Sequence, residues 1–148
     1  MNITQTMDVG LCLDVLTNTE IFEAISEDNA TIEHLKVDVL TDIWLKIEVD
    51  SSLIGVVQFK HAFTNCFDCH IHILPQHRKN YSLLAGENIV EWCTDNMAGK
   101  TLFATVPTYC KSVVNYLKRF NFSNSGIIPK AWTKNKTQYD LLILSRGF

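Results

Sequence analysis

The sequence has no apolar run long enough to cross a membrane and little of what makes a chain disordered. The longest apolar stretches, such as residues 53–57 and 141–144, fall far short of the roughly 20 residues that a membrane helix needs. Glycine and proline are scarce, with six and three residues. The formal charge of −3 gives no electrostatic reason to expect nucleic acid or an anionic membrane as a partner. The first eight residues lack the basic and apolar segments of a signal peptide, so we expect a cytoplasmic location.

The composition is that of an ordinary globular protein. Apolar residues make up 47% of the 148 residues and charged residues 20%, which is enough apolar surface for a substantial core. We therefore expect one domain spanning residues 1–148. The five cysteines are odd in number and lie mostly within apolar patterns, which favours buried thiols over a disulfide framework.

The hydrophobic periodicity changes several times along the chain and predicts a mixed α/β protein. Residues 43–49, 53–59 and 67–74 are typical of three strands in an antiparallel meander that Pro75 ends. Residues 80–97 have apolar positions four apart, typical of a helix packed on a sheet. The other predicted strands are residues 9–15, 101–106, 126–132 and 139–144. A helix is predicted after Thr17, which has capping-box spacing with Glu20, and a short helix at 32–35. A last helix, capped by Thr108, has an apolar face of Cys110, Val113, Val114, Leu117 and Phe120.

Two short segments carry a family resemblance. Ile73-Leu74-Pro75 closes the meander, and Arg78 follows it. Phe120-Asn121-Phe122, with Gly126 after it, ends the last helix, where Asn121 can adopt a left-handed conformation. With this order of elements, nearly the whole chain resembles the GNAT family of acyl-CoA-dependent N-acyltransferases. The resemblance implies a mostly antiparallel central sheet of about six to seven strands, flanked by three to four helices.

The resemblance also implies a site for acetyl-CoA as co-substrate. In that family the backbone at positions matching Ile73 and Leu74 pairs with the pantetheine arm. A following loop of the form R-x-x-G-x-G/A holds the pyrophosphate at a helix N-terminus, and here it corresponds to Arg78, Lys79, Asn80, Tyr81, Ser82 and Leu83. Arg78 matches the first position, whereas Tyr81 and Leu83 replace the two small residues. Lys79, Asn80 and Ser82 can still offer side-chain donors and charge.

His70 and His72 are the candidate catalytic residues. They lie two apart in a strand and therefore share one face with Asp68. Either imidazole could act as the general base for an acceptor amine, because histidine titrates near neutral pH. The alternative is that both are ordinary exposed or hydrogen-bonded sheet residues. The family's tyrosine acid has no direct counterpart, since Leu117 stands at its position and Tyr116 would point about 100° away on a helix.

The string Cys66-Phe67-Asp68-Cys69-His70 has the C-x-x-C-H form of covalent haem attachment. Its position inside a strand and the missing export signal argue against haem. Zinc would use the same cysteines with His70 and His72, but alternation places Cys69 on the opposite face, so a four-ligand site would need a bulge. We therefore assign no metal and take buried thiols as the default.

Two functions stay open at this point. The first is an acetyl-CoA-dependent N-acetyltransferase that transfers the acetyl group directly to an amine, on a small molecule or a protein. The second is a GNAT-fold protein without catalytic activity that serves as a binding or structural module, and a homodimer is compatible with either function. Small proteins of this kind are similar to ones found in bacteriophage genomes, some of them virion components, which would change the expected location.

Overall fold

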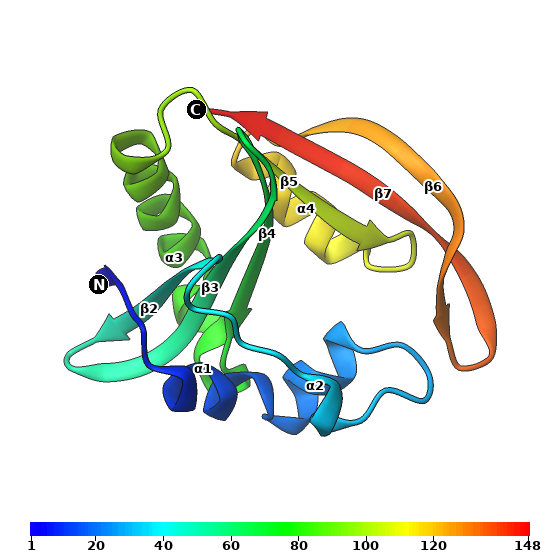
Figure 1. Ribbon diagram of the computed structural model, residues 1–148, viewed down its shortest axis with the longest axis horizontal. Coiled ribbons are helices and arrows are strands. Elements are labelled where there is room, and N and C mark those ends of the chain that lie inside the picture. Colours follow the sequence, from blue (N-terminus) through cyan, green and yellow to red (C-terminus); the bar gives the residue numbers. More distant parts are fainter.

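A single mixed sheet of seven strands organises the computed structural model, which describes residues 1–148 (Figure 1). The strand order is β1-β2-β3-β4-β5-β7-β6, and every neighbouring pair is antiparallel except β4 and β5. The strands are β1 (Asn2–Gln5), β2 (Ile43–Val49), β3 (Ser52–Phe63), β4 (Cys66–Ile73), β5 (Thr101–Pro107), β6 (Ser123–Lys134) and β7 (Thr137–Gly147). The helices are α1 (Val9–Leu16), α2 (Thr19–Ile25), α3 (Pro75–Asn96) and α4 (Lys111–Arg119), with a short 3₁₀ helix η1 (Ile32–His34). This arrangement confirms the predicted α/β fold class.

The two faces of the sheet carry separate hydrophobic clusters. The larger cluster joins the sheet to α3 and α4, and Phe59, Cys69, Ile89 and Leu117 are among its buried members. The smaller cluster joins α1 and α2 to Trp44 and to neighbouring residues of β2 and β3. Figure 1 shows α1 and α2 beneath the β2–β4 half of the sheet, and the tip of the long β6–β7 hairpin reaches down to the segment that follows α2.

The segment at residues 9–15, predicted as a strand, is helix α1. Asp8 caps it by accepting a hydrogen bond from the Leu11 amide at 2.9 Å, and Cys12, Val15 and Leu16 are buried at helical spacing. Short apolar runs fit a buried helix as well as a strand, which explains the error. The first strand is instead β1, and α2 is capped by Asn18 rather than Thr17.

Helix α3 begins five residues earlier than predicted. Pro75 ends β4, as expected, and also occupies the first turn of α3, where its missing amide and fixed φ cost nothing. The predicted buried stripe at Ala85, Ile89, Cys93 and Met97 is confirmed. Although α3 is 22 residues long, neither it nor any other helix combines the length and apolar composition required to span a bilayer.

Helix α4 differs from the prediction in its cap and in one position of its buried face. Its N-cap is Cys110 rather than Thr108, and Val113 is 44% exposed. Leu117 is buried as predicted, and Asn121 has the expected left-handed backbone, with φ 62°. Tyr116 takes up the space between α4 and α3, where its hydroxyl donates to the Ser82 carbonyl at 2.8 Å.

The close approach of α3 and α4 requires glycine at position 86. A Cβ there would overlap the Phe120 ring and the Tyr116 hydroxyl. We expect Gly86→Ala to lower the free energy of unfolding by about 1–3 kcal/mol, the usual cost of overpacking, measured by urea denaturation. Gly10→Ala is the matched control, because its Cβ would meet only the Asp8 carboxylate oxygen at 3.4 Å. Equal stability of Gly86→Ala and the wild type would show that the two helices pack less tightly than described.

Candidate functional site

The parallel strands β4 and β5 pair at one end only. Their register runs from Cys66–Thr101 to Asp68–Phe103, although β4 continues to Ile73 and β5 to Pro107. Over the same length β4 stays paired with β3 on its other side. Beyond Asp68 the two strands therefore present unpaired backbone edges to each other, where a ligand can supply the missing hydrogen bonds.

An Asp–His pair lies where the strands separate. The Nε2 atom of His70 is 3.2 Å from Oδ2 of Asp68, and the side chains are 35% and 20% exposed. The other carboxylate oxygen of Asp68, Oδ1, is buried without a hydrogen-bond partner. Because a carboxylate orients and polarises an imidazole that it contacts, this pair has the arrangement of a general base with its positioning group.

His72 occupies a different environment on the same face. Its ring stacks on His70, with centroids 6.2 Å apart and planes 5° from parallel, but only 8% of the residue is exposed. Burial, with smaller electrostatic contributions from His70 and Arg78, lowers the pKa of His72 to about 3. His72 is therefore neutral at physiological pH and closed to solvent, whereas His70 is accessible.

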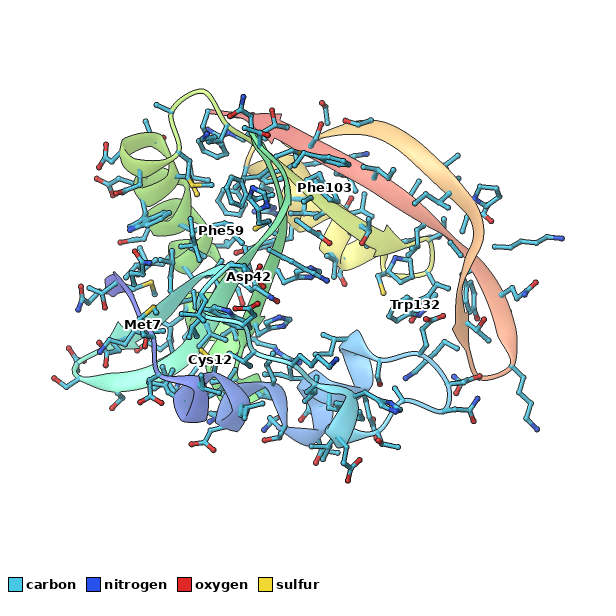
Figure 2. All side chains as sticks on the ribbon, viewed as in Figure 1. Met7, Cys12, Asp42, Phe59, Phe103 and Trp132 are labelled. Carbon is cyan, nitrogen blue, oxygen red and sulfur yellow. The ribbon has the colours of Figure 1, made fainter.

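The β3 residue beside His70 is held by a carboxylate. Gln58 lies opposite His70 in β3, and its side-chain amide donates to Asp42 Oδ2 at 2.7 Å. Asp42 also accepts a hydrogen bond from the His61 amide at 3.2 Å through its other oxygen. The side chain next to His70 is thus fixed by a carboxylate from the segment before β2, which Figure 2 shows near the centre of the molecule.

The residues predicted to form a pyrophosphate loop lie in the first turns of α3. Arg78 donates through Nε to the Ile73 carbonyl at 2.9 Å, and its guanidinium is 3.5 Å from Glu20 of α2. Leu74 is the N-cap residue of α3, which begins at Pro75. Pro75 has no amide hydrogen and the His77 amide donates to the Leu74 carbonyl, so the positive potential at the end of β4 comes from the Arg78 guanidinium and the dipole of α3.

The other predicted cofactor residues are spread around α3 instead of gathering in a loop. Lys79 and Asn80 are exposed, and Leu83 is 49% exposed. Tyr81 packs against the larger core cluster, and the Ser82 carbonyl accepts the Tyr116 hydroxyl. The sequence signal that would have shown this is Pro75, because proline is favoured in the first turn of a helix.

Tyr116 is held away from the face that carries His70. Besides its bond to Ser82, its ring packs edge-on against Phe120 at 5.0 Å between centroids. Burial, with a smaller contribution from Cys69, raises the pKa of Tyr116 to about 12. This position agrees with the expectation that Tyr116 does not replace the tyrosine missing at Leu117.

An aromatic group that the sequence did not reveal lies on the His70 face. Trp132 of β6 and Tyr139 of β7 are direct cross-strand partners, and Tyr139 packs on Tyr109 with centroids 4.6 Å apart. The indole Nε1 of Trp132 donates to the Tyr109 hydroxyl at 3.2 Å. Figure 2 shows Trp132 on the inner side of the hairpin. Cross-strand pairing brings these rings together, which the separate segments do not show.

The C-x-x-C-H string folds as plain strand. Cys66 shares the face of His70, whereas Cys69 is buried on the opposite face with Cys93, as alternation predicts. All five cysteines are free thiols, and three of them are buried. No three His, Cys, Asp or Glu side chains gather in a geometry that would hold a metal ion.

Comparison with known structures supports the same architecture. Spermidine N-acetyltransferase from Vibrio cholerae, in complex with CoA and spermine, matches with a TM-score of 0.75 at 14% identity, covering 97% of this chain and 94% of that one. Ribosomal-protein-alanine N-acetyltransferase from Brucella melitensis matches with a TM-score of 0.73 at 16% identity over the full length of both chains. A GNAT-family acetyltransferase from Streptococcus pneumoniae matches with a TM-score of 0.72 at 13% identity, covering 98% and 97%.

Further comparisons concern the length of chain that is matched and the sequence family. For mutant forms of the spermidine/spermine N-acetyltransferase of Vibrio cholerae, this chain aligns with 66% of the length of that chain. A search of curated protein sequences gave no match. Residues 6–145 match the model of the family described as "Protein of unknown function (DUF2824)". The chain therefore belongs to the DUF2824 family, and it has the GNAT fold.

Proposed function

We propose that this protein is an N-acetyltransferase that uses acetyl-CoA and transfers the acetyl group directly to an amine. The observation that carries the proposal is the separation of β4 and β5 directly beside the Asp68–His70 pair. The N-acetyltransferases with the same fold support it. A strand edge for the co-substrate and a base for the acceptor would then lie within a few residues of each other.

The residues at the end of β4 fit the co-substrate in chemical terms. The unpaired backbone between Cys69 and Ile71 offers hydrogen bonds to an amide-bearing arm such as pantetheine, whereas the Ile73 carbonyl already accepts from Arg78. Arg78 offers a cation for a pyrophosphate at the positive end of the α3 dipole, with Lys79 exposed beside it. Because Tyr81 and Leu83 already lie within α3, the pyrophosphate would be held at the helix end and not in a glycine-rich loop.

His70 is the better placed of the two histidines for the base. Acetyl-CoA supplies an activated thioester, so the protein has to orient the acceptor amine and remove its proton. His70 contacts Asp68 through Nε2, which leaves Nδ1 for the amine, and Asp68 stabilises the imidazolium that forms. His72 contributes a neutral, buried ring that stacks beside His70.

The acceptor is an amine on a small molecule or a protein. A homodimer, a bacteriophage source, and a cytoplasmic or virion location stay predictions.

The first measurement is calorimetric titration of the reduced protein with acetyl-CoA. We expect saturable binding in the micromolar range, and binding about tenfold weaker for Arg78→Ala, because one charge-assisted contact is lost. Lys36→Ala removes an exposed cation in the segment before β2 and is the control. If Arg78→Ala binds like the wild type, the pyrophosphate position is wrong. If the wild type does not bind at millimolar acetyl-CoA, the protein is a non-catalytic module.

The catalytic assignment is tested by thiol release in the presence of an amine identified from a screen. We expect His70→Gln to lower turnover roughly 10²- to 10⁴-fold, the usual contribution of a general base, with acetyl-CoA affinity unchanged. Asp68→Asn should lower turnover less and shift the pH profile, because it leaves the imidazole in place. A His70→Gln variant that retained wild-type turnover would move the base elsewhere, with His72 the next candidate.

The burial of His72 makes the stability of the protein depend on pH. His72 is neutral in the folded protein down to about pH 3, whereas in the unfolded chain it takes up a proton near pH 6.5. Protons therefore favour unfolding, and stability is lost as the pH falls below the unfolded pKa, at about 1.4 kcal/mol per pH unit. We expect His72→Gln to flatten this slope between pH 6.5 and pH 4, and His61→Gln, an exposed control, to leave it unchanged. An unaltered slope for His72→Gln would mean that His72 is not buried.

A further inference from the structure

The tip of the β6–β7 hairpin is bound by one carboxylate from a distant part of the chain. Asn135 and Lys136 form a two-residue turn with φ values of 52° and 60°. Their amides donate to the two carboxylate oxygens of Asp28, at 2.9 Å and 2.7 Å. These backbone hydrogen bonds, that of Lys136 foremost, lower the pKa of Asp28. A single side chain thus satisfies both amides that a tight turn leaves free.

Four further hydrogen bonds join the same two segments. The Thr133 amide donates to Glu27 Oε1 at 2.8 Å, and the Thr133 carbonyl accepts from the Asp28 amide at 3.1 Å. The Lys134 ammonium donates to the Glu23 and Ser26 carbonyls at 2.8 and 2.9 Å. We call this set of contacts between residues 23–28 and 133–136 the clasp.

The clasp fixes an element that would otherwise be loosely held. Strands β6 and β7 pair with each other up to Lys134–Thr137, but β7 pairs with β5 only as far as Leu141. The outer part of the hairpin is therefore a two-stranded ribbon, which is marginally stable by itself. Hydrogen bonds to α2 and the segment after it restrict the motion of this ribbon.

The aromatic group lies on that restrained ribbon. Trp132 and Tyr139 form its last pair before the clasp, and both side chains are partly buried. The register places Tyr139 on the same face as Phe103 and Asp68. The face of the sheet that carries His70 thus has β4 at one side and the aromatic rings at the other. The clasp joins the hairpin to the α2 segment at its outer end (Figure 2).

We propose that Asp28 is a specificity-determining residue of the acceptor site, because the clasp fixes the hairpin whose Trp132 and Tyr139 lie on the same face of the sheet as Asp68 and His70. The inference rests on the proposed function. The acceptor is then a slender alkyl amine whose chain lies against the aromatic rings, and an amine that does not contact these rings gains nothing from the clasp. Aromatic faces suit both a methylene chain and a cationic group on it.

Asp28→Ala tests the clasp and its consequence separately. We expect hydrogen exchange at the Asn135 and Lys136 amides to become at least tenfold faster, with acetyl-CoA affinity unchanged. The KM for a slender alkyl amine should rise at least fivefold while kcat stays within twofold, and relative activity on a lysine-containing peptide should increase. Asp14→Ala removes an exposed carboxylate of α1 and should leave all five quantities at the wild-type level.

A second variant tests the clasp independently, in case Asp28→Ala fails to fold. Lys134→Met breaks the bonds to the Glu23 and Ser26 carbonyls while leaving Asp28 intact, and it should raise the same KM in the same direction. Faster exchange without a change in acceptor preference in either variant would overturn the role in specificity. If the wild type fails to bind acetyl-CoA, the proposed function fails and this inference with it, and the titration identifies that outcome.

Discussion

The structure depends on one incomplete pairing, the parallel contact between β4 and β5. Full pairing of these strands would give an ordinary continuous sheet with no backbone left for a ligand. Because the ladder stops at Asp68–Phe103, the sheet divides into a half covered by α1 and α2 and a half that carries the long hairpin. Helix α3 connects the two strands, and its first turn with Arg78 lies at the open end of β4.

Along β4, alternation separates structural from chemical roles. Phe67, Cys69 and Ile73 are buried in the larger core and hold the strand in place. Asp68 and His70 face the other way, where α1 and α2 no longer cover the sheet fully. His72 lies two residues further along, and this shift is enough to bury it. One strand therefore carries an accessible histidine, His70, and a buried, neutral histidine, His72.

The sequence predicted the strands of the meander, the buried stripe of α3 and the left-handed Asn121, because periodicity and backbone preference are local properties. It mistook α1 for a strand, since a short apolar run fits both structures. It also placed the start of α3 too late, because Pro75 was taken only as the end of a strand. Val113 is exposed since Tyr116 and Phe120 fill the contact with α3.

The sequence by itself determined the fold class and the shared face of Asp68, His70 and His72, because strand alternation is fixed by covalent geometry. Only the tertiary structure decided which histidine is accessible, since burial depends on where α1 and α2 end across the sheet. It also joined Asp28 to a turn more than 100 residues away, and Trp132 to Tyr109. Such contacts follow from strand order and chain crossing, which no local pattern encodes.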